Sequence, residues 1–178
     1  MTLAHLHLLL NHIPLISLPL ALIFFCYGYY AKNINTQRFA LIVLFITSAL
    51  VLPVYFTGEA AEEAVEHLAN NIEDFIHPHE EAAEISLVLT LAAGLVALAS
   101  FWFSRAKTLM PQTLNISVIA ITIGAILSLG YTGSLGGQIR HTEIRPGASA
   151  ATNQGTDSEK QDKVFNVKEE HSGEKDND

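Results

Sequence analysis

Carboxylate and imidazole side chains are concentrated in one central stretch of the chain, GEAAEEAVEHLANNIEDFIHPHEEAAEIS (58–86). The stretch holds nine carboxylates and no Lys or Arg, and its three histidines are His67, His77 and His79. Carboxylate oxygens combined with imidazole nitrogens suit iron, manganese or zinc. The composition therefore predicts a metal-binding segment.

The spacing inside this stretch leaves two interpretations open. On a helix, Glu59, Glu62, Glu63 and Glu66 fall on one arc with His67 at its edge, and Glu63 and His67 are neighbours four residues apart. These residues are either metal ligands or the solvated face of an acidic helix. The segment contains neither HExxH nor the strict Glu-x-x-His spacing of di-iron bundles, so the pattern favours neither.

Long apolar runs flank the acidic stretch on both sides. About 20 helical residues cross a ~30 Å hydrocarbon core, and the sequence predicts helices over about 8–30, 39–57 (extending to about 69), 78–103 and 113–135. The expected fold is all-α, a four-helix transmembrane bundle with a helical acidic outer loop. Pro78 is expected at the first turn of the third helix. We expect a retained first helix rather than a cleaved signal peptide, because no basic segment precedes it and no A-x-A site follows it.

The domain boundary is expected near residue 146. Residues 1–146 contain the apolar runs and form the transmembrane domain, whereas 147–178 consist almost entirely of polar and charged residues. Such a segment cannot bury enough apolar surface to offset its ordering entropy. We therefore expect 147–178 to be a disordered tail.

Basic residues predict the orientation in the bilayer. Cytoplasmic connections carry an excess of Lys and Arg, and the first and third connections contain Lys32, Arg38, Arg105 and Lys107. Both termini and the acidic loop then lie outside a bacterial inner membrane, although Arg140 and Arg145 count against this. In this topology all eight histidines lie on the outer side.

Composition excludes several function classes. The net charge of -8 argues against nucleic-acid binding, which needs a basic surface. The single cysteine, Cys26, excludes an intrachain disulfide and a cysteine-based zinc site. The expected partners are the lipid bilayer, a redox or other membrane protein, and further copies of the chain.

Small residues indicate which helix faces are packed. In the third helix Ala82, Ala83, Ser86, Thr90, Ala93 and Ala97 share a face, and in the fourth Ser117, Ala120, Gly124 and Ser128 form a stripe. Small faces allow membrane helices to approach closely. His79 falls on the first of these faces, so we expect it to point into the bundle, as a ligand or as an ordinary hydrogen-bonded histidine.

Four segments, LNHIPLI (10–16), PVYFTGEAAEEAVEH (53–67), HEEAAE (79–84) and GSLGGQIRHTEIR (133–145), resemble a family of small four-helix bacterial inner-membrane proteins. The resemblance covers roughly residues 5–146 and implies the fold without implying a reaction. It marks ten positions, namely His12, Gly58, Glu59, Glu62, His67, His79, Glu80, Gly137, Arg140 and His141. Links of related proteins to cytochrome-containing chains raise the expectation of redox chemistry.

The leading hypothesis is an outer-face site for a transition metal (Fe, Zn, Mn or Cu) or a redox cofactor. The expected ligands are His12, His67, His79 and His141, assisted by Glu59, Glu62 and Glu80. A first alternative is a b-type haem electron-transfer subunit, with His12 and His79 as axial ligands and Arg140 or Arg145 pairing the propionates. A second is a non-catalytic scaffold or pH-responsive interaction protein, because histidines titrate near neutral pH.

The predicted orientation can be tested with fusions. A reporter that is active only outside the cytoplasm should be active when fused after Asn71 and inactive when fused after Lys107, because the connection around Lys107 is basic and the acidic loop around Asn71 has no Lys or Arg. The reverse pattern would place the histidines on the cytoplasmic side.

Overall fold

The computed structural model describes residues 2–65, 72–105 and 110–145, and every regular element within these ranges is a helix. Among them, four helices are long and apolar enough to cross a membrane, Leu3–Tyr30, Ile34–Phe56, Glu73–Ser104 and Gln112–Arg140. The predicted all-α class is confirmed. The chain divides into two compact units, Met1–Ile139 and Arg140–Asp178, and each is described by itself. The predicted tail, 147–178, lies outside the described residues.

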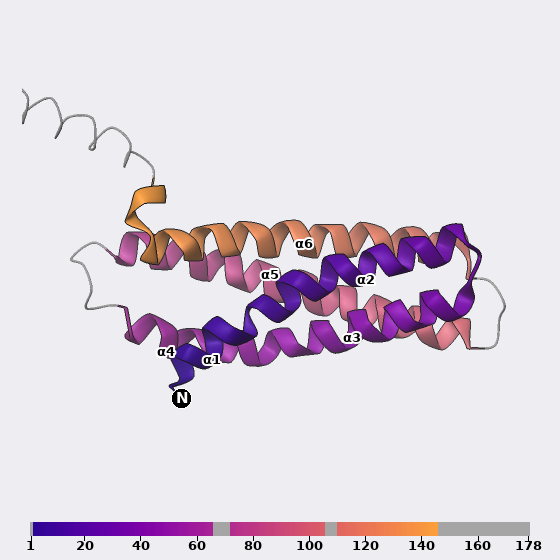
Figure 1. Cartoon of the computed structure of the whole chain (residues 1–178), viewed down its shortest axis with the longest axis horizontal. Coiled ribbons are helices and arrows are strands. Elements are labelled where there is room, and N and C mark those ends of the chain that lie inside the picture. The colour runs from indigo at the N-terminus through magenta and orange to yellow at the C-terminus, as the bar shows by residue number, and fades with distance from the viewer. Residues whose placement is uncertain (1, 66–71, 106–109, 146–178) are drawn as a thin grey trace, which may run out of the picture. The chain divides into compact units, whose positions relative to one another are not determined.

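The first unit is a bundle of long helices (Figure 1). Its elements are α1 (Leu3–Leu10), α2 (His12–Tyr30), α3 (Ile34–Phe56), α4 (Gly58–Glu63), α5 (Glu73–Ser104) and α6 (Gln112–Arg140, whose last residue belongs to the second unit). Helix α3 packs against both α2 and α5, and α1 packs against α4. Figure 1 shows α6 running beside α5, to which it is joined by hydrogen bonds from Ser86 to Ser128 and Thr132.

The outer surface of the bundle is apolar and its interior is rich in small and hydroxyl residues. Large apolar side chains such as Ile23, Val88, Leu95 and Leu127 are each more than 60% exposed. A soluble protein would bury such residues, whereas a bilayer solvates them. This surface therefore suits lipid, in agreement with the length and hydropathy of the helices.

The interior is divided along its length into an apolar part and a polar part. The apolar cluster contains Leu18, Phe25, Leu41, Leu44 and Val118. Next to it, the Gln37 side chain donates a 3.0 Å hydrogen bond to Asn115, which joins the start of α3 to the start of α6. The rest of the interior, toward the start of α5, is lined mainly by Ser and Thr.

Close helix contacts depend on two glycines. A Cβ on Gly28 would lie 2.8 Å from the Gln37 backbone nitrogen, at the tight turn that joins α2 to α3. A Cβ on Gly94 would lie 2.6 Å from the Ser48 Cβ, at the contact between α3 and α5. Because real Cβ atoms do not approach so closely, glycine at these positions fixes how near the helices come.

The structure corrects two predicted boundaries around the acidic stretch. Helix α5 begins at Glu73 and contains Pro78, so the predicted start at Pro78 is wrong. Proline lacks one backbone donor but is tolerated near a helix start, and the acidic residues of the first turn favour the earlier start. Helix α3 ends at Phe56 and is followed by a separate α4, so the predicted continuous extension breaks at Thr57, and residues 66–71 lie outside the described residues.

The structure also corrects the predicted fourth helix. Helix α6 continues to Arg140, past the predicted end near residue 135 and through the glycine-rich segment GSLGG (133–137). Its buried face contains Asn115, Val118, Thr122, Ala125 and Thr132. Ser117 and Ala120 of the predicted stripe are exposed instead. Hydrogen bonds from Asn115 and Thr132 to other helices determine the rotation of α6, and these outweigh side-chain size.

We predict opposite stability effects for alanine at two glycines. Gly94→Ala should lower the thermal unfolding midpoint in detergent, because overpacking against Ser48 costs about 1–3 kcal/mol. Gly124→Ala is the matched control, since no atom lies within 4 Å of its added Cβ, and it should be neutral or stabilising by up to about 1 kcal/mol. Equal effects at both positions would contradict the close contact.

Candidate functional site

His79 is held between α5 and α6, facing the bundle as predicted. Its Nδ1 lies 2.9 Å from the Thr132 carbonyl oxygen of α6. The ring lies against Gly136, where an added Cβ would be 2.9 Å from the His79 Cε1 atom. The small-residue face of α5 continues from this histidine through Ala82, Ser86 and Thr90, all of which are buried.

His7 of α1 has an equivalent environment, at the junction of α3 and α4. Its Nδ1 lies 2.9 Å from the Val54 carbonyl oxygen and 3.3 Å from the Thr57 hydroxyl. A Cβ on Gly58 would be 3.7 Å from the His7 Cε1 atom. The Thr57 hydroxyl itself donates to the Pro53 carbonyl, 2.8 Å away. Thus the imidazole of α1 is fixed at the break between α3 and α4.

The two histidines share one arrangement. Each ring lies against a glycine of another helix and bonds the backbone carbonyl of the residue that precedes this glycine by one helical turn. A carbonyl oxygen can only accept, so Nδ1 carries the proton in both rings. The neutral ring then has its lone pair on Nε2. Metal-binding histidines commonly have this arrangement, because a carbonyl on one nitrogen fixes the tautomer and orients the other nitrogen.

We call His7 and His79 the imidazole pair. The two rings are near enough to interact electrostatically, and the Glu80 carboxylate also acts on His79. Thr57 and Thr132, which contact the two rings, are each 8% exposed. The pair is therefore partly sheltered from solvent and has an acidic residue nearby.

His12 lies apart from this arrangement. It is exposed, and its Nδ1 donates a 2.7 Å hydrogen bond to the Leu8 carbonyl of the preceding turn. The axial pairing of His12 with His79 required both rings to face the bundle interior. Only His79 does so, and the geometry therefore does not support that pair.

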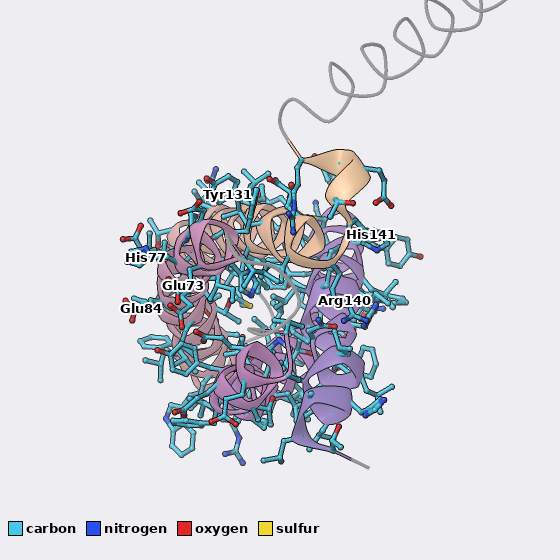
Figure 2. The ribbon with its side chains drawn as sticks, turned by 90° about the vertical axis from the view of Figure 1, so that its left-hand side faces the viewer. Glu73, His77, Glu84, Tyr131, Arg140 and His141 are labelled. Atoms are coloured by element: carbon cyan, nitrogen blue, oxygen red, sulfur yellow. The ribbon has the colours of Figure 1, made fainter. Side chains whose placement is uncertain are left out.

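The predicted carboxylate ligands are spread over the surface. Glu59 and Glu80 are exposed and Glu62 is half-buried, while His67 lies outside the described residues. Within 2–65, 72–105 and 110–145, no group of three or more His, Cys, Asp or Glu is arranged to hold a metal ion. His77 and Glu81 form an exposed 3.6 Å pair, and Figure 2 shows His77 and Glu84 on the outer side of the bundle.

Arg140 and His141 belong to the second unit, whose described part includes the short helix η2 (Thr142–Ile144). The His141 Nδ1–H donates a 2.9 Å hydrogen bond to the Glu143 carboxylate. The backbone N–H of Glu143, and then His141, lower the pKa of this exposed carboxyl from its usual value. His141 therefore has a local partner within its own unit.

His7 is the member of the imidazole pair that the sequence did not indicate as a ligand. The signal that would have found it is helical periodicity. The buried residues Pro14, Leu18, Ala21 and Phe25 alternate in steps of four and three, and His7 lies one heptad before Pro14. Starting the first helix at Leu8 cut this pattern off.

We predict that the imidazole pair is locked in the Nδ1–H tautomer. In protein labelled with ¹⁵N at histidine, long-range ¹⁵N–¹H spectra in detergent should show protonated Nδ1 and unprotonated Nε2 for both rings when the rings are neutral. Gly136→Ala should perturb the His79 signals, because its Cβ occupies the space of the ring.

Gly133→Ala serves as the control for this substitution, since no atom lies within 4 Å of its added Cβ. An Nε2–H tautomer, or equal spectra for both alanine variants, would contradict the arrangement of His79.

The functional interpretation depends on this geometry alone. No protein-family model, curated protein or solved structure matches the chain.

Proposed function

We propose that the chain is a multi-pass membrane protein that binds a transition-metal ion through the Nε2 atoms of His7 and His79. The supporting observation is that both Nδ1 atoms bond backbone carbonyls. Each ring therefore has its Nε2 lone pair available for a ligand, and both rings lie in the same unit. Because the charge of His7 acts on His79, we propose that the two lone pairs share one ion.

The donor atoms suggest which ions the site takes. Neutral imidazole suits zinc, copper, iron and nickel, and of these we propose Zn²⁺ or Cu²⁺ first, because both bind histidine nitrogen strongly. Two imidazoles leave further coordination positions. Water or a carboxylate can fill these, and the candidates are Glu80, which acts electrostatically on His79, and the half-buried Glu62.

The proposed ligand set differs from the sequence-based one. His7 replaces His12, whose ring bonds its own helix, and His79 is retained. His67 stays a proposed ligand on sequence grounds. An ion with exchangeable positions can accept a substrate, a redox partner or an incoming metal. The class we propose is thus a metal-binding or redox subunit.

Orientation is part of the same proposal. The basic residues around Lys32 and Arg105 favour a cytoplasmic location for these two connections. The imidazole pair lies at the opposite end of the helices that the connections join. In a bacterial inner membrane the site would then face the outside. Metal ions or redox partners of the extracytoplasmic space would reach it without crossing the membrane.

We predict that removing either imidazole of the pair weakens metal binding. Purified protein in detergent, equilibrated with Zn²⁺ or Cu²⁺ and assayed by elemental analysis, should retain stoichiometric metal. His7→Ala and His79→Ala should each weaken binding by at least about 10-fold, because even outer-shell partners cost 10–100-fold.

His12→Ala and His77→Ala are matched controls, since both rings are exposed, and they should bind like the parent protein. Binding that survives loss of both His7 and His79 would refute the site. A Soret band in protein grown with haem available would replace the ion with a b-type haem. Absence of both cofactors would leave the scaffold alternative.

A further inference from the structure

Hydroxyl side chains form a second feature of the bundle interior. We define the hydroxyl file as Ser86, Thr132, Ser128, Thr90, Thr122 and Ser48, which come from α3, α5 and α6. All except the half-buried Ser128 are buried. Because the outer surface of these helices is apolar, the file is the principal polar surface inside this part of the unit.

The file begins at the imidazole pair. His79 bonds the Thr132 carbonyl, and the Thr132 hydroxyl lies 2.8 Å from the Ser86 hydroxyl. The Ser86 hydroxyl also lies 2.6 Å from that of Ser128. These contacts link α5 and α6 directly below His79, and every hydroxyl among them has a partner.

Deeper in the bundle the hydroxyls lose their partners. Thr90 follows Ser86 by one helical turn on α5, and Thr122 precedes Ser128 on α6, which runs in the opposite direction. Ser48 of α3 packs on Gly94, one turn below Thr90. These three side chains are at most 1% exposed, and their hydroxyl oxygens have no hydrogen-bond partner among the described residues.

Beyond Ser48 the interior becomes apolar, and a further buried hydroxyl without a partner among the described residues, Ser100, lies past this apolar part, one turn after Ala97 on α5. Leu41, Leu44, Ala97 and Val118 belong to the buried apolar cluster. Beyond them the Gln37–Asn115 bond joins α3 to α6. The hydroxyl file therefore leads to the imidazole pair at one end and stops at the apolar cluster at the other, with Ser100 and the Gln37–Asn115 pair beyond that cluster.

We propose that water occupies the hydroxyl file and forms a half-channel from the imidazole pair to the middle of the bundle. A buried hydroxyl without a partner costs about 1–3 kcal/mol, and three neighbouring ones are satisfied together by a few bridging waters. Ionisable side chains within a membrane face the bundle interior or a water-filled cavity, and the hydroxyl file leads away from one such side chain, His79. The half-channel goes beyond metal binding and does not depend on it.

The competing explanation is a dry core. Ser and Thr in membrane helices also satisfy their hydroxyls by bonding the carbonyl four residues earlier on their own helix. Thr132 does this, with a 3.1 Å contact to the Ser128 carbonyl, whereas Thr90, Thr122 and Ser48 have no such bond in this structure. Water access separates the two explanations.

Cysteine accessibility provides the test. In a Cys26→Ala background, Thr90→Cys and Thr122→Cys should react with Ag⁺ or a small cationic methanethiosulfonate at least about tenfold faster than Ala97→Cys, because thiolates form poorly in apolar surroundings. Ala97 is the matched control, since it is as buried as the threonines but belongs to the apolar cluster. Equally slow reaction at all three positions would overturn the half-channel.

A second measurement uses the unmodified protein, in case a cysteine variant fails to fold. Hydroxyl radicals generated by X-ray pulses in bound water should oxidise the segments around Thr90 and Thr122 more than the segment around Ala97. No difference would also overturn the proposal. His7→Ala and His79→Ala should keep this labelling whether or not they bind metal, which separates the half-channel from the proposed metal site.

Discussion

The fold depends on one constraint, that a polar group buried between apolar helices needs a partner in the protein or in bound water. In this chain the partner lies on a neighbouring helix at each end of the interior. Gln37 bonds Asn115 at one end, and His79 bonds the Thr132 carbonyl at the other. Dispersion alone would let apolar helices slide or rotate against one another, since lipid tails compete for the same contacts. These polar contacts fix the rotation and register of α6.

The same constraint explains why glycine accompanies each imidazole of the pair. A helical carbonyl is normally covered by the side chains of the following turn. Gly58 and Gly136 remove that cover one turn after Val54 and Thr132, so that a ring can reach each carbonyl. The resulting bond fixes the tautomer and leaves Nε2 available. Preorganisation of this kind is what a metal site needs, because a mobile imidazole loses conformational entropy when it binds.

The sequence predicted those features that arise from one helix at a time. Apolar run length located four helices, and the small face of α5 correctly placed His79 toward the bundle. Features that depend on a partner helix were missed or wrong. His7 could not be recognised, because its partner carbonyl belongs to Val54, 47 residues away. The predicted small stripe of α6 was wrong at Ser117 and Ala120, which are exposed, although Ser128 does bond Ser86. The hydrogen bond that Gln37 donates to Asn115 turns a different side of the start of α6 inward.

The imidazole pair lies next to the hydroxyl file, and the buried apolar cluster lies beyond the file. An ion bound to two nitrogens needs water or carboxylate for its remaining positions. The hydroxyl groups below His79 would hold water that reaches the ion from inside the bundle, and the Glu80 carboxylate would add negative charge near His79. The apolar cluster around Leu44 and Val118 would prevent that hydration from crossing the whole bundle. In that arrangement a bound ion would be in contact with water on one side of the apolar cluster and sealed from the other side.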